Sequence, residues 1–157
     1  MILGIDPWIR KLGYALIKKD LEIVDAGVLL LEEKFPNRQS QFKRMLEIYN
    51  FFEKLIKKNK IRIISIEKLF FTRFNQANAE FVYGMRWLIL MLAVKNKIEI
   101  VEYAPIQLKK FVTGNGKAEK ILVQRCVMKL FGLKELPKPA DVADALGLAR
   151  IVSKKIN

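Results

Sequence analysis

The first fourteen residues, MILGIDPWIRKLGY, place a carboxylate in an otherwise apolar strand. Strand-forming residues from Ile2 to Ile5 precede Asp6, and residues 13–17 (GYALI) are typical of the second strand of a hairpin. An ionised carboxylate that is buried in such a strand is unfavourable unless a positive charge compensates it. No neighbouring side chain must pair with Asp6, which makes a bound metal ion an attractive candidate partner.

The charge balance points to a partner that carries many negative charges. Lysine and arginine number 29 against 16 acidic residues, which gives a formal net charge of +13 and a pI near 9.9. Such an excess favours nucleic acid over an acidic small molecule, with an anionic membrane surface as the lesser possibility. With 157 residues, 52% of them hydrophobic, we expect one folded domain over residues 1–157.

Composition also limits the chemistry and the compartment. The chain contains no histidine, so imidazole bases and histidine metal ligands are excluded, and catalysis falls to carboxylates, lysines and water. The single Cys126 cannot form an internal disulfide and fits a reducing compartment. The longest apolar run, 87–94, is too short to cross a bilayer, and an apolar strand begins at residue 2, where a signal peptide would have its charged start. We expect a cytoplasmic protein without membrane association.

Hydrophobic periodicity predicts an α/β order of elements. The strand around Asp6 and two more strands, over 13–17 and 21–31, favour an antiparallel meander. From Ser40 onward, apolar residues recur three or four positions apart, as in an amphipathic helix: Phe42, Met45, Leu46, Tyr49, Phe52 and Ile56. Residues 62–66 (RIISI) are typical of a strand buried on both faces, and this strand ends at Glu67.

The remaining elements alternate in the same way. We predict a helix over 75–95, a strand over 98–101, a short helix through 111, a helix from the loop 113–117 to about 131, and a last helix from 140 to about 154. The second half of 75–95 is apolar nearly all round. This helix is either purely a core helix, or one of its faces meets a second copy of the chain. We predict a homodimer contact through the helix around residues 75–95.

Two connecting segments each have two interpretations. Segment 69–74 contains Phe70, Phe71, Arg73 and Phe74, and it is either a hydrophobic plug over the core or a set of exposed rings that stack on unpaired bases. The loop 113–117 (TGNGK) is either a simple turn or a phosphate contact, since glycine lets the backbone approach a phosphate closely. Four lysines around the loop favour the phosphate contact: Lys109, Lys110, Lys117 and Lys120.

The last helix begins with two more carboxylates. Asp141 and Asp144 are three residues apart and therefore lie on one face of the helix, among small apolar residues. Asp141 has an alternative role as a helix cap or dipole partner, which Asp144, one turn into the helix, does not have.

A cluster of Asp6, Glu67, Asp141 and Asp144 would raise the pKa of its members unless cations separate them. Oxygen-only ligands suit two Mg²⁺ or Mn²⁺ ions, which in a phosphodiester displacement activate a water and stabilise the leaving oxygen. A basic surface around such a site is the expected character of a nuclease.

Four motifs occur in a fixed order along the chain: Gly4-Ile5-Asp6-Pro7, Ile66-Glu67 followed by Phe70, the loop 113–118 (TGNGKA), and segment 139–146 (PADVADAL). In order and spacing, over nearly the whole chain, they resemble the RuvC family of Holliday-junction resolvases. The resemblance implies an α/β, ribonuclease-H-like fold with a five-stranded mixed sheet, its first three strands antiparallel, and helices on both faces. It also implies a homodimer whose two sites nick opposing strands of a four-way DNA junction, leaving 5′-phosphate and 3′-hydroxyl ends.

The resemblance also implies residue roles by matched position. Asp6, Glu67, Asp141 and Asp144 correspond to the family's metal-binding catalytic carboxylates, which hold two Mg²⁺ ions for which Mn²⁺ can substitute. Lys109 and Lys120 correspond to basic residues near the scissile phosphate, and we count Lys120 as catalytic. Phe70 corresponds to an aromatic residue that stacks at the junction centre, and we add Phe71, Arg73 and Lys117 as DNA-binding residues.

The chain departs from the family pattern at Trp8, where the family usually has a small residue after Asp-Pro. Three other functions compete with a resolvase. A module that binds branched DNA without cutting has no use for four carboxylates, and a nucleotide-binding ATPase of the actin and sugar-kinase type needs more than twice this length. An RNA-strand hydrolase of the same fold need not dimerise. The sequence identifies no helicase partner.

Overall fold

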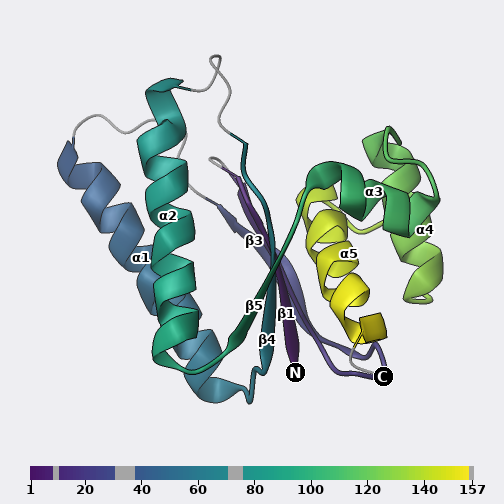
Figure 1. The fold of residues 1–157 in the computed structure, drawn as a ribbon, viewed down its shortest axis with the longest axis horizontal. Helices are drawn as coiled ribbons and strands as arrows, with labels where there is room; N and C mark the ends of the chain where they lie inside the picture. The colour runs from purple at the N-terminus through teal and green to yellow at the C-terminus, as the bar shows by residue number, and fades with distance from the viewer. Residues whose placement is uncertain (9–10, 31–37, 71–75, 156–157) are drawn as a thin grey trace.

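A five-stranded sheet lies between two groups of helices (Figure 1) in the computed structural model, which describes residues 1–8, 11–30, 38–70 and 76–155. The elements in chain order are β1 (Ile2–Pro7), β2 (Lys11–Ile17), β3 (Ile23–Leu30), α1 (Arg38–Lys58), β4 (Ile63–Glu67), α2 (Gln76–Lys95), β5 (Glu99–Tyr103), α3 (Pro105–Thr113), α4 (Lys120–Leu130) and α5 (Ala140–Lys155).

The sheet has the strand order β3-β2-β1-β4-β5. The first three strands pair antiparallel, whereas β1, β4 and β5 run parallel to one another. The predicted five-stranded mixed sheet with an antiparallel start is therefore confirmed. Because β1 and β4 are parallel neighbours, with Ile5 beside Ile66, their carboxyl ends meet at the same edge of the sheet.

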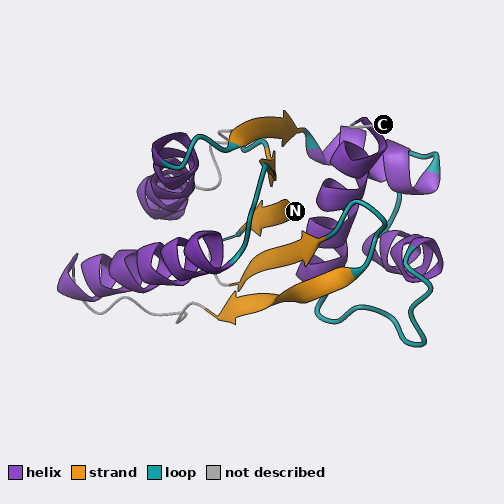
Figure 2. Cartoon of the chain, turned by 90° about the horizontal axis from the view of Figure 1, so that it is seen from below, coloured by secondary structure: helices purple, strands orange, loops and turns teal. Residues whose placement is uncertain are grey.

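Helices cover both faces of the sheet, as predicted (Figures 1 and 2). Each layer of helices encloses its own apolar cluster. Side chains alternate between the faces of a strand, so Leu3 and Ile64 join the cluster under α1 and α2, while Ile2 and Ile63 join the cluster under α5. A strand buried on both faces has apolar residues at successive positions, which explains the continuous apolar runs of β1 and β4. No helix within the described ranges is long and apolar enough to span a membrane.

Two predicted details differ from the structure. Phe42 and Leu46, assigned to the apolar face of α1, are exposed, and the buried residues of this helix are Ile48, Phe52, Leu55 and Ile56. The first half of α1 lies away from the sheet in Figure 1, so the correct period does not ensure burial there. The third strand begins at Ile23 because a turn precedes it, in which Leu21 has a positive φ of 73° and its N–H donates to the Lys18 carbonyl.

Helix α5 lies unusually close to the sheet at Gly4, in the middle of β1. A Cβ atom at this position would stand 2.0 Å from the Ala145 carbonyl oxygen and 2.8 Å from the Ala149 nitrogen. Both neighbours are main-chain atoms of α5, so no side chain can move aside. The absence of a side chain at residue 4 therefore sets the distance between α5 and the strand that carries Asp6.

We predict that Gly4→Ala destabilises the protein by about 3 kcal/mol, because the methyl group forces α5 away from the sheet. Gly84→Ala is the matched control: its Cβ would meet only the flexible end of the Met45 side chain at 2.9 Å, inside helix α2. Alanine is favoured over glycine within a helix by up to about 1 kcal/mol, so this variant should be neutral or stabilised. Urea denaturation measures both, and equal stabilities would contradict the close packing inferred at Gly4.

Candidate active site

Four carboxylates from three elements share one end of the molecule. Asp6 is the penultimate residue of β1 and Glu67 is the last residue of β4, so both stand at the common carboxyl edge of these strands. Asp141 and Asp144 lie in the first turns of α5. The charges of Glu67, Asp144 and Asp141 all act on Asp6, which shows that the fold brings the predicted set together.

A second glycine positions the start of α5. Gly13 lies opposite Asp6 in the β1–β2 ladder, and a Cβ atom on it would stand 2.4 Å from the Asp141 carbonyl oxygen. The bare backbone of β2 thus lets Asp141 approach the strand pair that carries Asp6. This role of Gly13 was not predicted, although the sequence carries a signal for it, a glycine in an apolar strand near the first carboxylate.

Burial and mutual repulsion raise the pKa of three of these groups. Asp6 is only 7% exposed, and burial, followed by the charges of Glu67, Asp144 and Asp141, holds its pKa well above the ordinary range. Burial and the charge of Asp144 raise the pKa of Glu67 to about 7. Burial raises the pKa of Asp144 to about 6, and the charge of Asp141 contributes. The site therefore holds more negative charge than its surroundings favour.

Two of the predicted lysines oppose this charge. Lys120, the first residue of α4, lowers the pKa of Asp6, Glu67 and Asp144. Lys109 of α3 lowers the pKa of Glu67 and Asp144. Both lysines thus lie near the carboxylates and partly offset their negative charge.

Of the other predicted DNA-binding residues, Phe70 and Lys117 are exposed, and two lie outside the described residues. Phe70 is exposed, with the Lys68 Nζ 5.9 Å from its ring centroid, which fits an accessible ring better than a plug over the core. Lys117 is exposed in a loop whose backbone is fixed locally, since the Asn115 side chain accepts a hydrogen bond from the Lys117 N–H at 2.9 Å. Phe71 and Arg73 lie outside the described residues.

Oxygen donors without histidine or cysteine suit hard divalent cations such as Mg²⁺ or Mn²⁺. Within the described part of the chain, no group of three or more acidic or cysteine side chains has the arrangement of a finished metal site. The composition of the cluster and its unfavourable concentration of negative charge nevertheless fit such a cation, which would remove the repulsion that raises the pKa of Asp6, Glu67 and Asp144.

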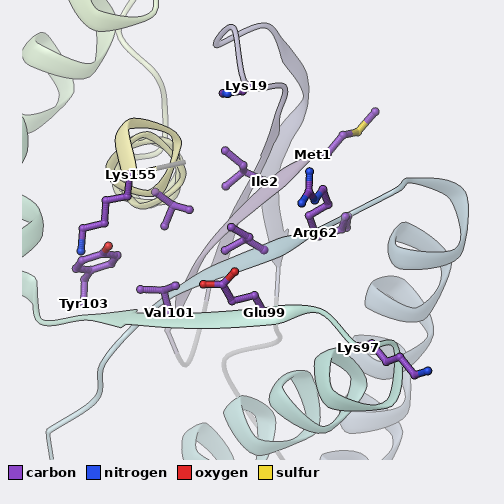
Figure 3. Close-up of a pocket in the computed structure, with 12 residues that line it drawn as sticks. Met1, Ile2, Lys19, Arg62, Lys97, Glu99, Val101, Tyr103 and Lys155 are labelled. Atoms are coloured by element: carbon purple, nitrogen blue, oxygen red, sulfur yellow. The ribbon is translucent and has the colours of Figure 1, made fainter. Parts of the chain in front are cut away.

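A pocket of 720 Å³ is lined by residues at the beginnings of β1 and β4, along β5 and at the end of α5 (Figure 3). Its walls include Ile2 and Arg62, at the beginnings of β1 and β4, and Lys155 at the end of α5. Tyr103 also lines the pocket; it is the last residue of β5 and pairs with Glu67 in the β4–β5 register. The pocket therefore extends along β5 toward the carboxylate end of the sheet, although none of the four carboxylates lines it.

A sequence model of the family "Crossover junction endodeoxyribonuclease RuvC" matches residues 2–152. The chain belongs to this family. A RuvC from Caldicellulosiruptor saccharolyticus is 36% identical over 152 residues, which cover 94% of this chain and 89% of the relative. A RuvC from Ruminiclostridium cellulolyticum is 39% identical over 154 residues, covering 95% of this chain and 89% of the relative.

The fold agrees with this assignment. The structure of Thermus thermophilus RuvC in complex with a Holliday junction substrate superimposes with a TM-score of 0.79 at 26% identity, covering 94% of this chain and 88% of that one. The predicted ribonuclease-H-like fold is therefore confirmed. In this RuvC-family chain, the match includes β1, β4 and α5, the three elements that carry the carboxylates.

We predict that Asp6→Asn changes the pH dependence of stability in the metal-free protein. An acid whose pKa is raised on folding holds its proton more tightly in the folded chain, so its contribution to stability is fully present below its unfolded pKa and is lost as pH rises through its raised folded pKa. The amide side chain of the variant carries no charge, so the variant should gain stability relative to wild type as pH rises from about 4 to about 8. Thermal melts in EDTA measure the difference.

The exposed Asp20→Asn is the control, and its melting curve should follow that of wild type across the pH range. Mg²⁺ at about pH 8 should stabilise wild type more than Asp6→Asn, because wild type keeps the full set of ligand charges. Parallel pH profiles for wild type and Asp6→Asn would contradict the charge crowding described above.

Proposed function

We propose that this protein is a structure-selective endonuclease that resolves four-way DNA junctions by metal-dependent phosphodiester hydrolysis. The observation that carries the proposal is the convergence of Asp6, Glu67, Asp141 and Asp144 beside Lys120, in a chain of the RuvC family. The T. thermophilus relative, solved with a Holliday junction substrate, supports the choice of substrate. The proposed products are nicks with 5′-phosphate and 3′-hydroxyl ends, made in pairs on opposing strands.

The four carboxylates are the proposed ligands that would hold two Mg²⁺ ions, for which Mn²⁺ can substitute. When bound, these ions supply the activation of a water and the stabilisation of the leaving oxygen. Burial of Asp6 holds its carboxylate in place, because the side chain belongs to a strand that is paired on both sides. Glu67 and Asp144 approach from neighbouring elements, so the ligand set depends on tertiary packing.

The cations around the carboxylates are the proposed phosphate contacts. Lys120, at the first position of α4, adds a positive charge beside the acids and is assigned to the developing charge at the scissile phosphate. Lys109 and Lys117 are assigned to the flanking backbone, and the exposed Phe70 to stacking on an unpaired base. Phe71 and Arg73 keep their proposed DNA-binding roles from the sequence analysis.

The exposed face of α2 supports the proposed homodimer. Trp87, Met91 and Val94 are 60%, 63% and 61% exposed and follow one another at the spacing of one helical stripe. Large exposed apolar groups in one stripe are typical of a protein contact. A two-fold dimer would present two equivalent sites to a four-way junction of approximate two-fold symmetry, from which paired incision follows.

Two expectations of the sequence analysis remain proposals. We place the protein in the cytoplasm, since a junction nuclease acts where the DNA is. We also propose that residues 1–157 act as one domain. No helicase partner is assigned.

We predict that wild type with Mg²⁺ nicks a labelled synthetic four-way junction at paired positions, while a linear duplex and an RNA–DNA hybrid stay intact. Asp6→Asn should cut the junction about 1,000-fold more slowly, because it removes one ligand charge from the metal site, and should still bind the junction. Denaturing gels measure the nicks, and gel shifts measure binding. Binding without cutting in either Mg²⁺ or Mn²⁺ would favour a binding module, and hydrolysis of the hybrid would favour the RNA hydrolase.

We predict that Trp87→Glu yields a folded monomer that makes single, unpaired nicks, because a charge in an apolar contact opposes association. Leu130→Glu on α4 is the control, since it places the same charge on another exposed apolar residue and should leave the dimer intact. Analytical ultracentrifugation measures the mass. A Trp87→Glu protein that still sediments as a dimer would refute the assignment of this face.

A further inference from the structure

A buried arginine connects α2 with the end of the strand that carries Glu67. Arg86 is 7% exposed, in the second half of α2. Its Nε donates a hydrogen bond to the Glu67 main-chain carbonyl at 3.5 Å, and its Nη2 forms an ion pair with the Glu102 carboxylate on β5. A single guanidinium therefore links a helix to the last residue of β4 and to the neighbouring strand.

Arg86 donates a hydrogen bond to the Glu67 carbonyl, for which the neighbouring strand β1 offers no N–H at its last residue. Glu67 is the last residue of β4, and the adjacent β1 ends in Pro7, which has no N–H to donate. Arg86 supplies a donor to the Glu67 carbonyl. The planar guanidinium has several donors at fixed angles, so it can hold this carbonyl and the Glu102 carboxylate at the same time.

The burial of Arg86 indicates that this position requires an arginine. A buried guanidinium is unfavourable unless it is paired and hydrogen-bonded. If this position served only to fill space, an apolar residue of similar volume would be sufficient. Glu102 provides the counter-charge, which leaves Nε free to reach the strand end. Arg86 contacts the backbone of Glu67 rather than its carboxylate, so it is placed to orient that residue and not to compete for a cation.

We propose that Arg86 is a positioning residue for the active site, which holds the end of β4, and with it the Glu67 carboxylate, against α2. This inference rests on the proposed function, because it assigns Glu67 to the metal site. Arg86 precedes the exposed Trp87 directly, so the helix that presents the proposed dimer face also fixes a proposed metal ligand. Groups that orient metal ligands typically change metal affinity or activity by about 10- to 100-fold when they are removed.

The test compares Arg86→Met and Arg86→Lys with wild type. Arg86→Met should weaken Mn²⁺ binding, measured by isothermal titration calorimetry, about 10-fold, and should lower kcat for junction cleavage about 10-fold with KM within twofold. Arg86→Lys keeps the charge opposite Glu102 but loses the forked donor, so it should restore only part of the Mn²⁺ affinity. Arg38→Met is the matched control: it removes an exposed arginine that pairs with Glu80 of α2 at 2.6 Å, and it should bind Mn²⁺ like wild type.

The inference is overturned if Arg86→Met binds Mn²⁺ and cleaves junctions as well as wild type does. Losses of Mn²⁺ affinity and kcat in the Arg38→Met control that equal those in Arg86→Met would overturn it too. If Arg86→Met does not fold by circular dichroism, Glu102→Gln decides. This variant leaves the Arg86 donor to the Glu67 carbonyl in place, so its Mn²⁺ affinity should be within about threefold of wild type. A loss of Mn²⁺ affinity of about 10-fold would instead assign the effect to the ion pair between Arg86 and Glu102. A wild type that binds Mn²⁺ but never cuts junctions would refute the proposed function alone, because the calorimetric comparison does not depend on cleavage.

Discussion

The burial of Asp6 is the constraint on which the rest of this structure depends. A carboxylate that is 7% exposed, with three other acids acting on it, belongs to a strand whose remaining residues are apolar and paired on both sides. Strand pairing fixes its position, and its charge makes that position unfavourable. Folding therefore concentrates negative charge at one edge of the sheet, and the surrounding elements either add to this charge, as α5 does, or oppose it, as Lys120 does.

Close packing brings that charge together. Helix α5 supplies Asp141 and Asp144 only because Gly4 and Gly13 let its backbone approach β1 and β2. The same helix buries a row of small and aliphatic residues, which makes it the centre of the second apolar cluster. Stability and site geometry thus depend on one packing surface, and a change that moves α5 affects both. This dependence is expected when the residues of one site come from three elements that are far apart in the sequence.

Much of this arrangement could be predicted from the sequence, because apolar runs and carboxylates coincide. The runs before Asp6 and Glu67 indicated buried strands, and the small residues around Asp144 indicated a buried helix face. Periodicity could not locate the edge of the sheet, which is why Phe42 was wrongly assigned to the buried face of α1. Gly13 and Arg86 were missed for another reason: their roles are contacts to main-chain atoms distant in sequence. A glycine in an apolar strand marks Gly13 as unusual, but no local pattern identifies the atom that either residue contacts. Their positions follow only from tertiary packing.

The helices on the two faces of the sheet contribute different features. The α5 side brings carboxylates to the edge of the sheet, whereas the α2 side combines core residues such as Met85 and Ile89 with an exposed apolar stripe. The Arg86 side chain reaches from α2 to the carboxyl end of β4, in the sheet that lies between the two layers of helices. If a second copy docks on the stripe, the helix that it touches is the one bonded to Glu67. The proposed dimer contact and the proposed metal site would then be connected through the Arg86 side chain, in both subunits of a two-fold pair.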